Sequence, residues 1–185
     1  FRGCFELANY CLETSGLKED ATFRFSQWDP NNTAKYEGTA EQWETAQRVM
    51  GEILAGTKAD AYICDAFSNP SVEQIGERIR PFLDEIRAKN KKAPVIFLRT
   101  IYRDGRLFDM KAEKKEATRI EYVDKLMKEI CAEYADVYFI DTPDQTGTDG
   151  LTSADGVHPC SWGYKRWADT IQPKVVEILS KYNIK

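Results

Sequence analysis

Four short apolar runs along the chain are predicted to be β-strands. They span residues 21–26, 61–67, 93–100 and 137–140. Apolar residues in them are nearly continuous rather than alternating with polar ones. This is typical of strands in a parallel sheet that is covered on both faces.

The segments between these runs carry apolar residues at helical spacing and are predicted to be helices. They cover residues 2–12, 39–56, 71–86, 112–134 and the stretch from 161 onwards. Ser71 and Gln74 fit a capping box at a helix start, whereas Pro81 and Pro173 are expected to kink their helices. The last helix is predicted to bury a stripe of Tyr164, Trp167, Ala168, Ile171, Val175 and Ile178.

The alternation of helices and strands predicts an α/β fold. No internal repeat and no linker divides residues 1–185, so we expect a single domain, a three-layer α/β/α sandwich around a parallel sheet. Ligands in such sheets bind outside the carboxyl ends of the strands. A site is therefore expected in the segments after Phe25, Phe67, Leu98 and Ile140.

Composition and charge narrow the classes of function. The 185 residues are 42% hydrophobic, and their net charge of −4 gives no electrostatic case for binding nucleic acid or an anionic membrane. No apolar run approaches the roughly 20 residues of a membrane-spanning helix. With one histidine and no clustered cysteines, a zinc site is not expected, and nothing else in the sequence implies a cofactor. The five scattered cysteines are expected to be buried free thiols, which favours a reducing, cytoplasmic compartment; they are Cys4, Cys11, Cys64, Cys131 and Cys160.

The single histidine, His158, lies in the sequence Asp155-Gly-Val-His-Pro159, between the last predicted strand and the last helix. Histidine is the usual general base because its ordinary pKa lies close to working pH. On a turn tightened by Gly156, the Asp155 carboxylate can reach one ring nitrogen and leave the other to accept a nucleophile's proton. The alternative for a lone histidine is a surface or capping residue.

Two blocks of the sequence resemble the SGNH hydrolases, also known as GDSL-type esterases and lipases. The block from Asp155 to Pro159, followed by Gly163-Tyr164 and an amphipathic helix, is similar to the last conserved block of that family. Residues 65–70, Asp-Ala-Phe-Ser-Asn-Pro, resemble the block that supplies an oxyanion-hole asparagine, in the form found in a Bacteroides-type subfamily.

The resemblance implies an SGNH-hydrolase or flavodoxin-like sandwich that hydrolyses carboxylic esters, with carbohydrate acetyl esters as a plausible class. It implies that His158 is the base, that Asp155 orients it, and that Asn69 donates to the oxyanion. The alternative for Asn69 is a loop residue that satisfies its own turn, because Asn-Pro is a common turn signal. The implied partner is a small-molecule or carbohydrate ester.

The sequence departs from the family pattern in two places. No Gly-Asp-Ser or Gly-Thr-Ser segment supplies a nucleophile, and Ser26 aligns better with a further conserved block of the family, matched here by residues 23–27. In the family that block supplies an oxyanion-hole glycine, which is replaced here by Arg24, with Gly38 a looser match. Two explanations stay open: the chain lacks its first strand and the serine that follows, or it is a non-catalytic binding domain that has lost the nucleophile.

Overall fold

The computed structural model describes residues 24–25, 36–37, 52, 56–57 and 59–184. The chain forms two compact units, Phe1–Lys58 with Phe82–Lys91, and Ala59–Pro81 with Lys92–Lys185. The second unit contains both loops that the sequence marked as candidate sites. Of the predicted helices, residues 2–12 lie outside the described residues, and 39–56 do so except at Glu52 and Gly56.

The first unit contains a small sheet that the apolar pattern assigned differently. Strand β1, Arg24–Phe25, pairs antiparallel with β2, Tyr36–Glu37, in a two-stranded sheet of its own. The expectation that the run at 21–26 joins the parallel sheet is therefore wrong for its described residues. A strand of two residues is too short for its apolar pattern to distinguish the two kinds of sheet.

The second unit is built on a parallel sheet with β4 in its centre. Strands β3 (Tyr62–Cys64), β4 (Val95–Leu98) and β5 (Val137–Ile140) follow one another in this order, and Ile63, Ile96 and Tyr138 stand in register. All four residues of β4 are buried. This confirms the prediction from its continuous apolar run, because a central strand with both faces covered has no position for a polar side chain.

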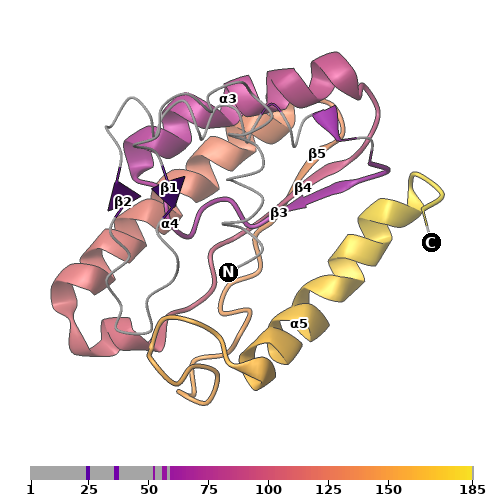
Figure 1. The fold of residues 1–185 in the computed structure, drawn as a ribbon. Helices are drawn as coiled ribbons and strands as arrows, with labels where there is room; N and C mark the ends of the chain where they lie inside the picture. The colour runs from indigo at the N-terminus through magenta and orange to yellow at the C-terminus, as the bar shows by residue number, and fades with distance from the viewer. Residues whose placement is uncertain (1–23, 26–35, 38–51, 53–55, 58, 185) are drawn as a thin grey trace. The chain divides into compact units, whose positions relative to one another are not determined.

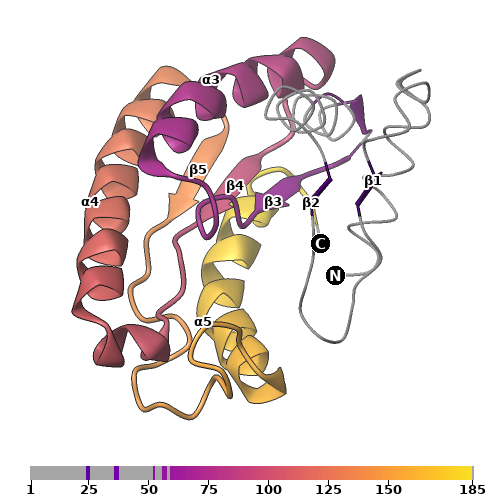
Figure 2. The same cartoon turned by 60° about the vertical axis from the view of Figure 1, so that its left-hand side comes forward.

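Helices cover the two faces of this sheet (Figure 1). Helix α4, Met110–Glu133, lies on one face and α5, Ser161–Ser180, on the other, as the turned view in Figure 2 also shows. The three-layer α/β/α sandwich expected from the sequence is thus confirmed. In the described part of the chain, no helix combines the length and apolarity needed to span a bilayer.

Helix α3, Val72–Lys89, starts as predicted. The Ser71 backbone N–H donates to Gln74 Oε1 at 3.0 Å, and the Gln74 N–H donates to Ser71 Oγ at 3.3 Å, which is the reciprocal pair of a capping box. Within the second unit, Arg80 on this helix forms two 2.8 Å hydrogen bonds to the Glu133 carboxylate at the end of α4. The first half of α3 therefore lies beside α4.

Helix α5 packs on the sheet through a narrower stripe than expected. Ile96, Leu98, Ile140 and Ile178 are buried together, and Trp167, Ile171 and Val175 pack against them. Tyr164, however, is 51% exposed, and Ala168 is also exposed, so their predicted burial is wrong. Tyr164 lies in the first turn of α5, where its ring stacks on that of Trp167 with 6.2 Å between the ring centroids. Ala168 lies beside the apolar stripe rather than in it.

Candidate active site

The loop between β5 and α5 folds Asp155 and His158 into one turn. Gly156 has φ +77°, a left-handed conformation that a residue with a Cβ adopts only at a cost. This conformation turns the chain back so that Asp155 Oδ1 accepts the backbone N–H of Val157 at 2.9 Å and that of His158 at 2.7 Å. The sequence Asp-Gly-Val-His is thus a local folding unit.

The other carboxylate oxygen of Asp155 contacts the imidazole ring. Asp155 Oδ2 lies 2.6 Å from His158 Nδ1, and the Ser153 hydroxyl donates to Oδ1 at 3.1 Å. The hydrogen bond from the His158 ring, then the N–H groups of His158 and Val157, hold the pKa of the Asp155 carboxyl well below its ordinary value. An ionised Asp155 accepts the Nδ1 proton, so Nε2 carries the lone pair of the neutral ring.

Contacts on both sides hold this turn in place. Ser153 and Pro159 form an antiparallel bridge, and the Cys160 N–H donates to the Thr152 carbonyl oxygen at 2.8 Å. Helix α5 begins directly afterwards, and a Cβ on Gly163 would overlap the Thr152 carbonyl oxygen. Gly163 is therefore needed for the close approach of the helix to the loop, which gives the glycine of this block a structural role.

Asn69 lies beyond the carboxyl end of β3, in the loop between β3 and α3. Its side chain is exposed and makes no hydrogen bond within the described part of the chain. The turn is closed instead by the Ser68 hydroxyl, which donates to Asp65 Oδ1 at 3.0 Å. The alternative in which Asn69 satisfies its own turn is therefore not what the structure contains.

One segment contacts both candidate loops. After β4 the chain continues to a 3₁₀ helix, η2, Asp104–Phe108. Just before it, Arg103 Nη2 donates to the Ser68 carbonyl oxygen at 2.7 Å, and within it the Gly105 N–H donates to the Gly156 carbonyl oxygen at 2.8 Å. The sequence predicted only that the segment after Leu98 could contribute to a site. It could not predict these two contacts, because residues so distant along the chain leave no local pattern.

Comparison with known proteins identifies the family. The sequence profile of the GDSL-like lipase/acylhydrolase family matches residues 44–176, more than half of the chain. The chain belongs to this family. A crystal structure of a GDSL-like lipase from Bacteroides ovatus ATCC 8483 superposes with a TM-score of 0.68 and 29% identity, covering 71% of this chain and 40% of that one. The SGNH/GDSL resemblance noted in the sequence is thereby confirmed.

Curated relatives of a different name also match. The threonine–tRNA ligase of Clostridium botulinum Eklund 17B is 30% identical over 189 residues, which is 99% of this chain and 25% of the ligase. That of Clostridium perfringens SM101 is 42% identical over 76 residues, 40% of this chain and 12% of the ligase. The chain thus spans at most a quarter of the length of these relatives.

Three serines of the described residues make hydrogen bonds elsewhere than at the His158 ring. Ser68 bonds Asp65, Ser71 caps α3 and Ser153 donates to Asp155 rather than to the His158 ring. Ser26 and Gly38 lie outside the described residues, and Arg24 belongs to β1 in the first unit.

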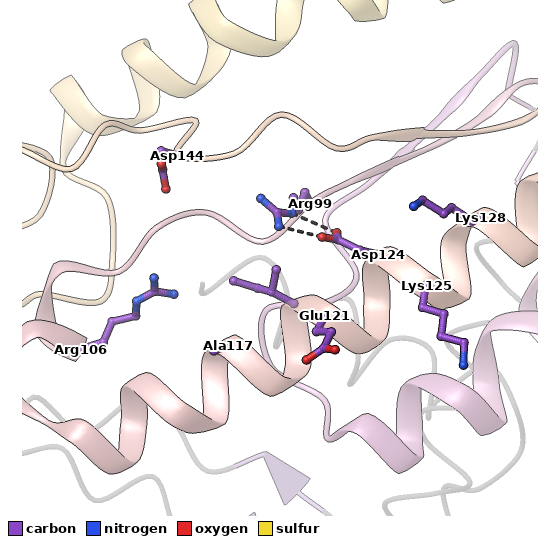
Figure 3. Close-up of a pocket in the computed structure, with 9 residues that line it drawn as sticks. Arg99, Arg106, Ala117, Glu121, Asp124, Lys125, Lys128 and Asp144 are labelled. Atoms are coloured by element: carbon purple, nitrogen blue, oxygen red, sulfur yellow. Dashed lines mark hydrogen bonds and ion pairs between the residues drawn. The ribbon is translucent and has the colours of Figure 1, made fainter.

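A groove of about 610 Å³ lies between α4 and the ends of β4 and β5 (Figure 3). Neither Asn69 nor the Asp155–His158 pair lines it. In the groove, Arg99 Nε and Nη2 donate to the two carboxylate oxygens of Asp124 at 3.0 and 2.7 Å. This two-point ion pair fixes the first residue after β4 to α4, so the segment that reaches both candidate loops starts from an anchored position.

Proposed function

We propose that this GDSL-family protein hydrolyses carboxylic esters, with His158 as the general base and Asp155 as the group that orients it. The observation that carries the proposal is the 2.6 Å contact between His158 Nδ1 and Asp155 Oδ2, at the carboxyl edge of the sheet of a GDSL-like fold. The proposal assigns no residue of this chain as the nucleophile.

In the proposed reaction a serine hydroxyl attacks the ester carbonyl and passes its proton to His158 Nε2. Asp155 stabilises the resulting imidazolium, and Asn69 donates its side-chain N–H to the oxygen that gains negative charge. One such donor contributes about 3–4 kcal/mol to the transition state. The imidazolium then protonates the departing alcohol, and water, deprotonated by His158, releases the acid from the serine.

Two classes of ester are candidates for the substrate. Carbohydrate acetyl esters follow from the resemblance to the Bacteroides-type subfamily. Aminoacyl esters are the second class, because the relatives are named as ligases that join threonine to tRNA, and an aminoacyl-tRNA bond is an ester. The net charge of −4 does not favour a tRNA partner for this chain alone, so small aminoacyl esters are the appropriate probe.

The test compares the full-length protein with its His158→Ala variant on p-nitrophenyl acetate, acetylated xylan fragments and threonine methyl ester. Val176→Ala, an exposed position on α5, is the matched control. We expect hydrolysis by the wild type and the control and its loss in His158→Ala. Equal rates for wild type and His158→Ala would exclude the proposed base. Absence of hydrolysis in all three proteins, with retained binding of an ester, would favour the non-catalytic binding domain.

A further inference from the structure

Two arginines meet at the carbonyl oxygen that precedes Asn69. Arg119, on α4, donates from Nη1 to the Ser68 carbonyl oxygen at 2.6 Å and to that of Phe67 at 3.4 Å. Arg103, after β4, donates from Nη2 to the same Ser68 oxygen at 2.7 Å. Two segments distant in the sequence thus converge on one peptide group of the β3–α3 loop.

The same arginines share one carboxylate. Glu116 Oε1 lies 3.2 Å from Arg119 Nη1 and 3.4 Å from Arg103 Nη1. The side chains of Arg119 and Glu116 are only 7% and 8% exposed, so this positive and this negative charge lie away from water, while Arg103 is 19% exposed. Taking such charges out of water costs several kcal/mol per ion before pairing offsets it.

This cluster is not arranged for stability alone. Glu116 Oε2 and Arg103 Nε are buried and have no hydrogen-bond partner in the described part of the chain. A buried ionic group that is only partly satisfied is commonly less stable than apolar residues of the same volume. What the cluster does achieve is to hold the carbonyl groups of Phe67 and Ser68 in fixed directions.

A fixed Ser68 carbonyl group sets the direction of the backbone at Asn69. The peptide group is planar, and no cis peptide bond occurs among the described residues, so the Asn69 N–H points opposite to the Ser68 carbonyl and away from the arginines. Pro70 restricts the backbone of Asn69 from the other side. The Asn69 Cα is therefore constrained in both directions, and its exposed amide starts from a defined position.

We propose that Arg119 and Arg103 are positioning residues that aim the Asn69 amide at the ester oxygen. Arg103 also belongs to the segment whose Gly105 bonds Gly156, so it relates the Asn69 loop to the turn that carries His158. This inference rests on the proposed esterase function, and it assigns to α4 a part in the site that neither sequence block contains.

The decisive experiment is a double-mutant cycle in the full-length protein. Arg119→Lys keeps the charge but replaces the planar guanidinium, whose Nη1 contacts the Ser68 oxygen and Glu116, with a shorter and more flexible side chain. We expect its kcat on p-nitrophenyl acetate to fall between about 10- and 100-fold with little change in KM, less than the roughly 10²–10³ lost with an oxyanion donor itself. In an Asn69→Ala background the same change should lower kcat no further, because the arginine acts through Asn69.

Arg80→Lys is the matched control, because Arg80 also pairs with a glutamate of α4, Glu133, but at the C-terminal end of that helix. It should leave kcat unchanged. An equal fall in kcat for Arg119→Lys with and without Asn69 would overturn the inference, as would no fall at all. If Arg119→Lys does not fold, Arg103→Lys, at a side chain 19% exposed, replaces it in the same cycle.

A second measurement separates this inference from the proposed function. The NMR order parameter of the Asn69 backbone amide should drop in Arg119→Lys and not in Arg80→Lys, whether or not the protein hydrolyses an ester. An inactive wild type would contradict the proposed function and leave this readout valid. An unchanged Asn69 order parameter would contradict the positioning role even in an active enzyme.

Discussion

Gly105 donates its backbone N–H to the carbonyl oxygen of Gly156 at 2.8 Å, and so joins the segment after β4 to the turn of Asp155 and His158. A Cβ built on Gly105 would lie 3.0 Å from that same oxygen. Both residues of the contact are glycines for different reasons: Gly105 because the neighbouring backbone is close, and Gly156 because its φ is positive. The turn that holds the candidate base is thus fixed from outside as well as by its own hydrogen bonds.

Gly156→Ala should destabilise the protein and impair hydrolysis. An alanine at φ +77° costs about 1–2 kcal/mol, and relaxing that strain displaces Asp155 from His158. Gly150→Ala is a matched control, because Gly150 also has a positive φ, +73°, with no atom within 4 Å of an added Cβ. Chemical denaturation should show a similar fall in the free energy of unfolding for both variants, while only Gly156→Ala lowers kcat. A normal kcat in Gly156→Ala would show that the turn tolerates rearrangement.

Gly163→Ala should destabilise the junction between the loop and α5. The added Cβ overlaps the Thr152 carbonyl oxygen, which belongs to backbone and cannot move aside cheaply, so we expect a loss of about 1–3 kcal/mol. The exposed Ala168→Ser on the same helix should change the unfolding free energy by no more than about 0.5 kcal/mol. Equal unfolding free energies for the two variants would mean that the loop is free to shift.

Asp155 should stay ionised in mild acid. Its folded pKa is lowered, chiefly by the His158 hydrogen bond, so the carboxylate stabilises the fold fully above its unfolded pKa of about 3.9. That contribution is lost as the pH falls through the lower, folded pKa. A carboxyl-carbon NMR titration should show no Asp155 step between pH 7 and pH 4. In His158→Ala the midpoint should rise, and a wild-type midpoint near 4 would contradict the pairing.

Asp155→Asn should impair catalysis more than it impairs folding. The amide retains an oxygen that can accept the backbone N–H groups, but it loses the charge that stabilises an imidazolium. In a comparable triad this change lowers kcat by about 10⁴. We expect a fall of at least about 10²-fold on p-nitrophenyl acetate with a melting temperature close to wild type. A kcat within a factor of about two of wild type would remove Asp155 from the proposed mechanism.

Cys64 should be unreactive in the folded protein. Burial raises the pKa of its thiol to about 11, so at pH 8 only about one molecule in a thousand carries the thiolate there. Iodoacetamide followed by mass spectrometry should label Cys64 only after denaturation. Rapid labelling under native conditions would contradict the raised pKa of this half-buried thiol.

The parts of the site that could be predicted from the sequence are those formed by neighbours in the chain. Asp155 and His158 are three residues apart on a turn with a glycine, so their contact depends on local geometry alone. The capping box of Ser71 and Gln74 was predictable for the same reason. The role of Asn69 could be suggested only by resemblance, because an exposed amide leaves no periodic pattern.

By itself, the sequence determined the strands and helices of the second unit, its parallel sheet and the turn that pairs Asp155 with His158. Continuous apolar runs, helical spacing and a glycine turn depend only on residues that are close together in the chain, so they can be recognised in the sequence. Only the tertiary structure decided that Arg119 and Arg103 meet at Ser68, 51 and 35 residues away, and that Gly105 bonds Gly156. Those contacts depend on the register of the sheet and on where α4 lies on it, and a buried arginine has the same letter in the sequence as an exposed one.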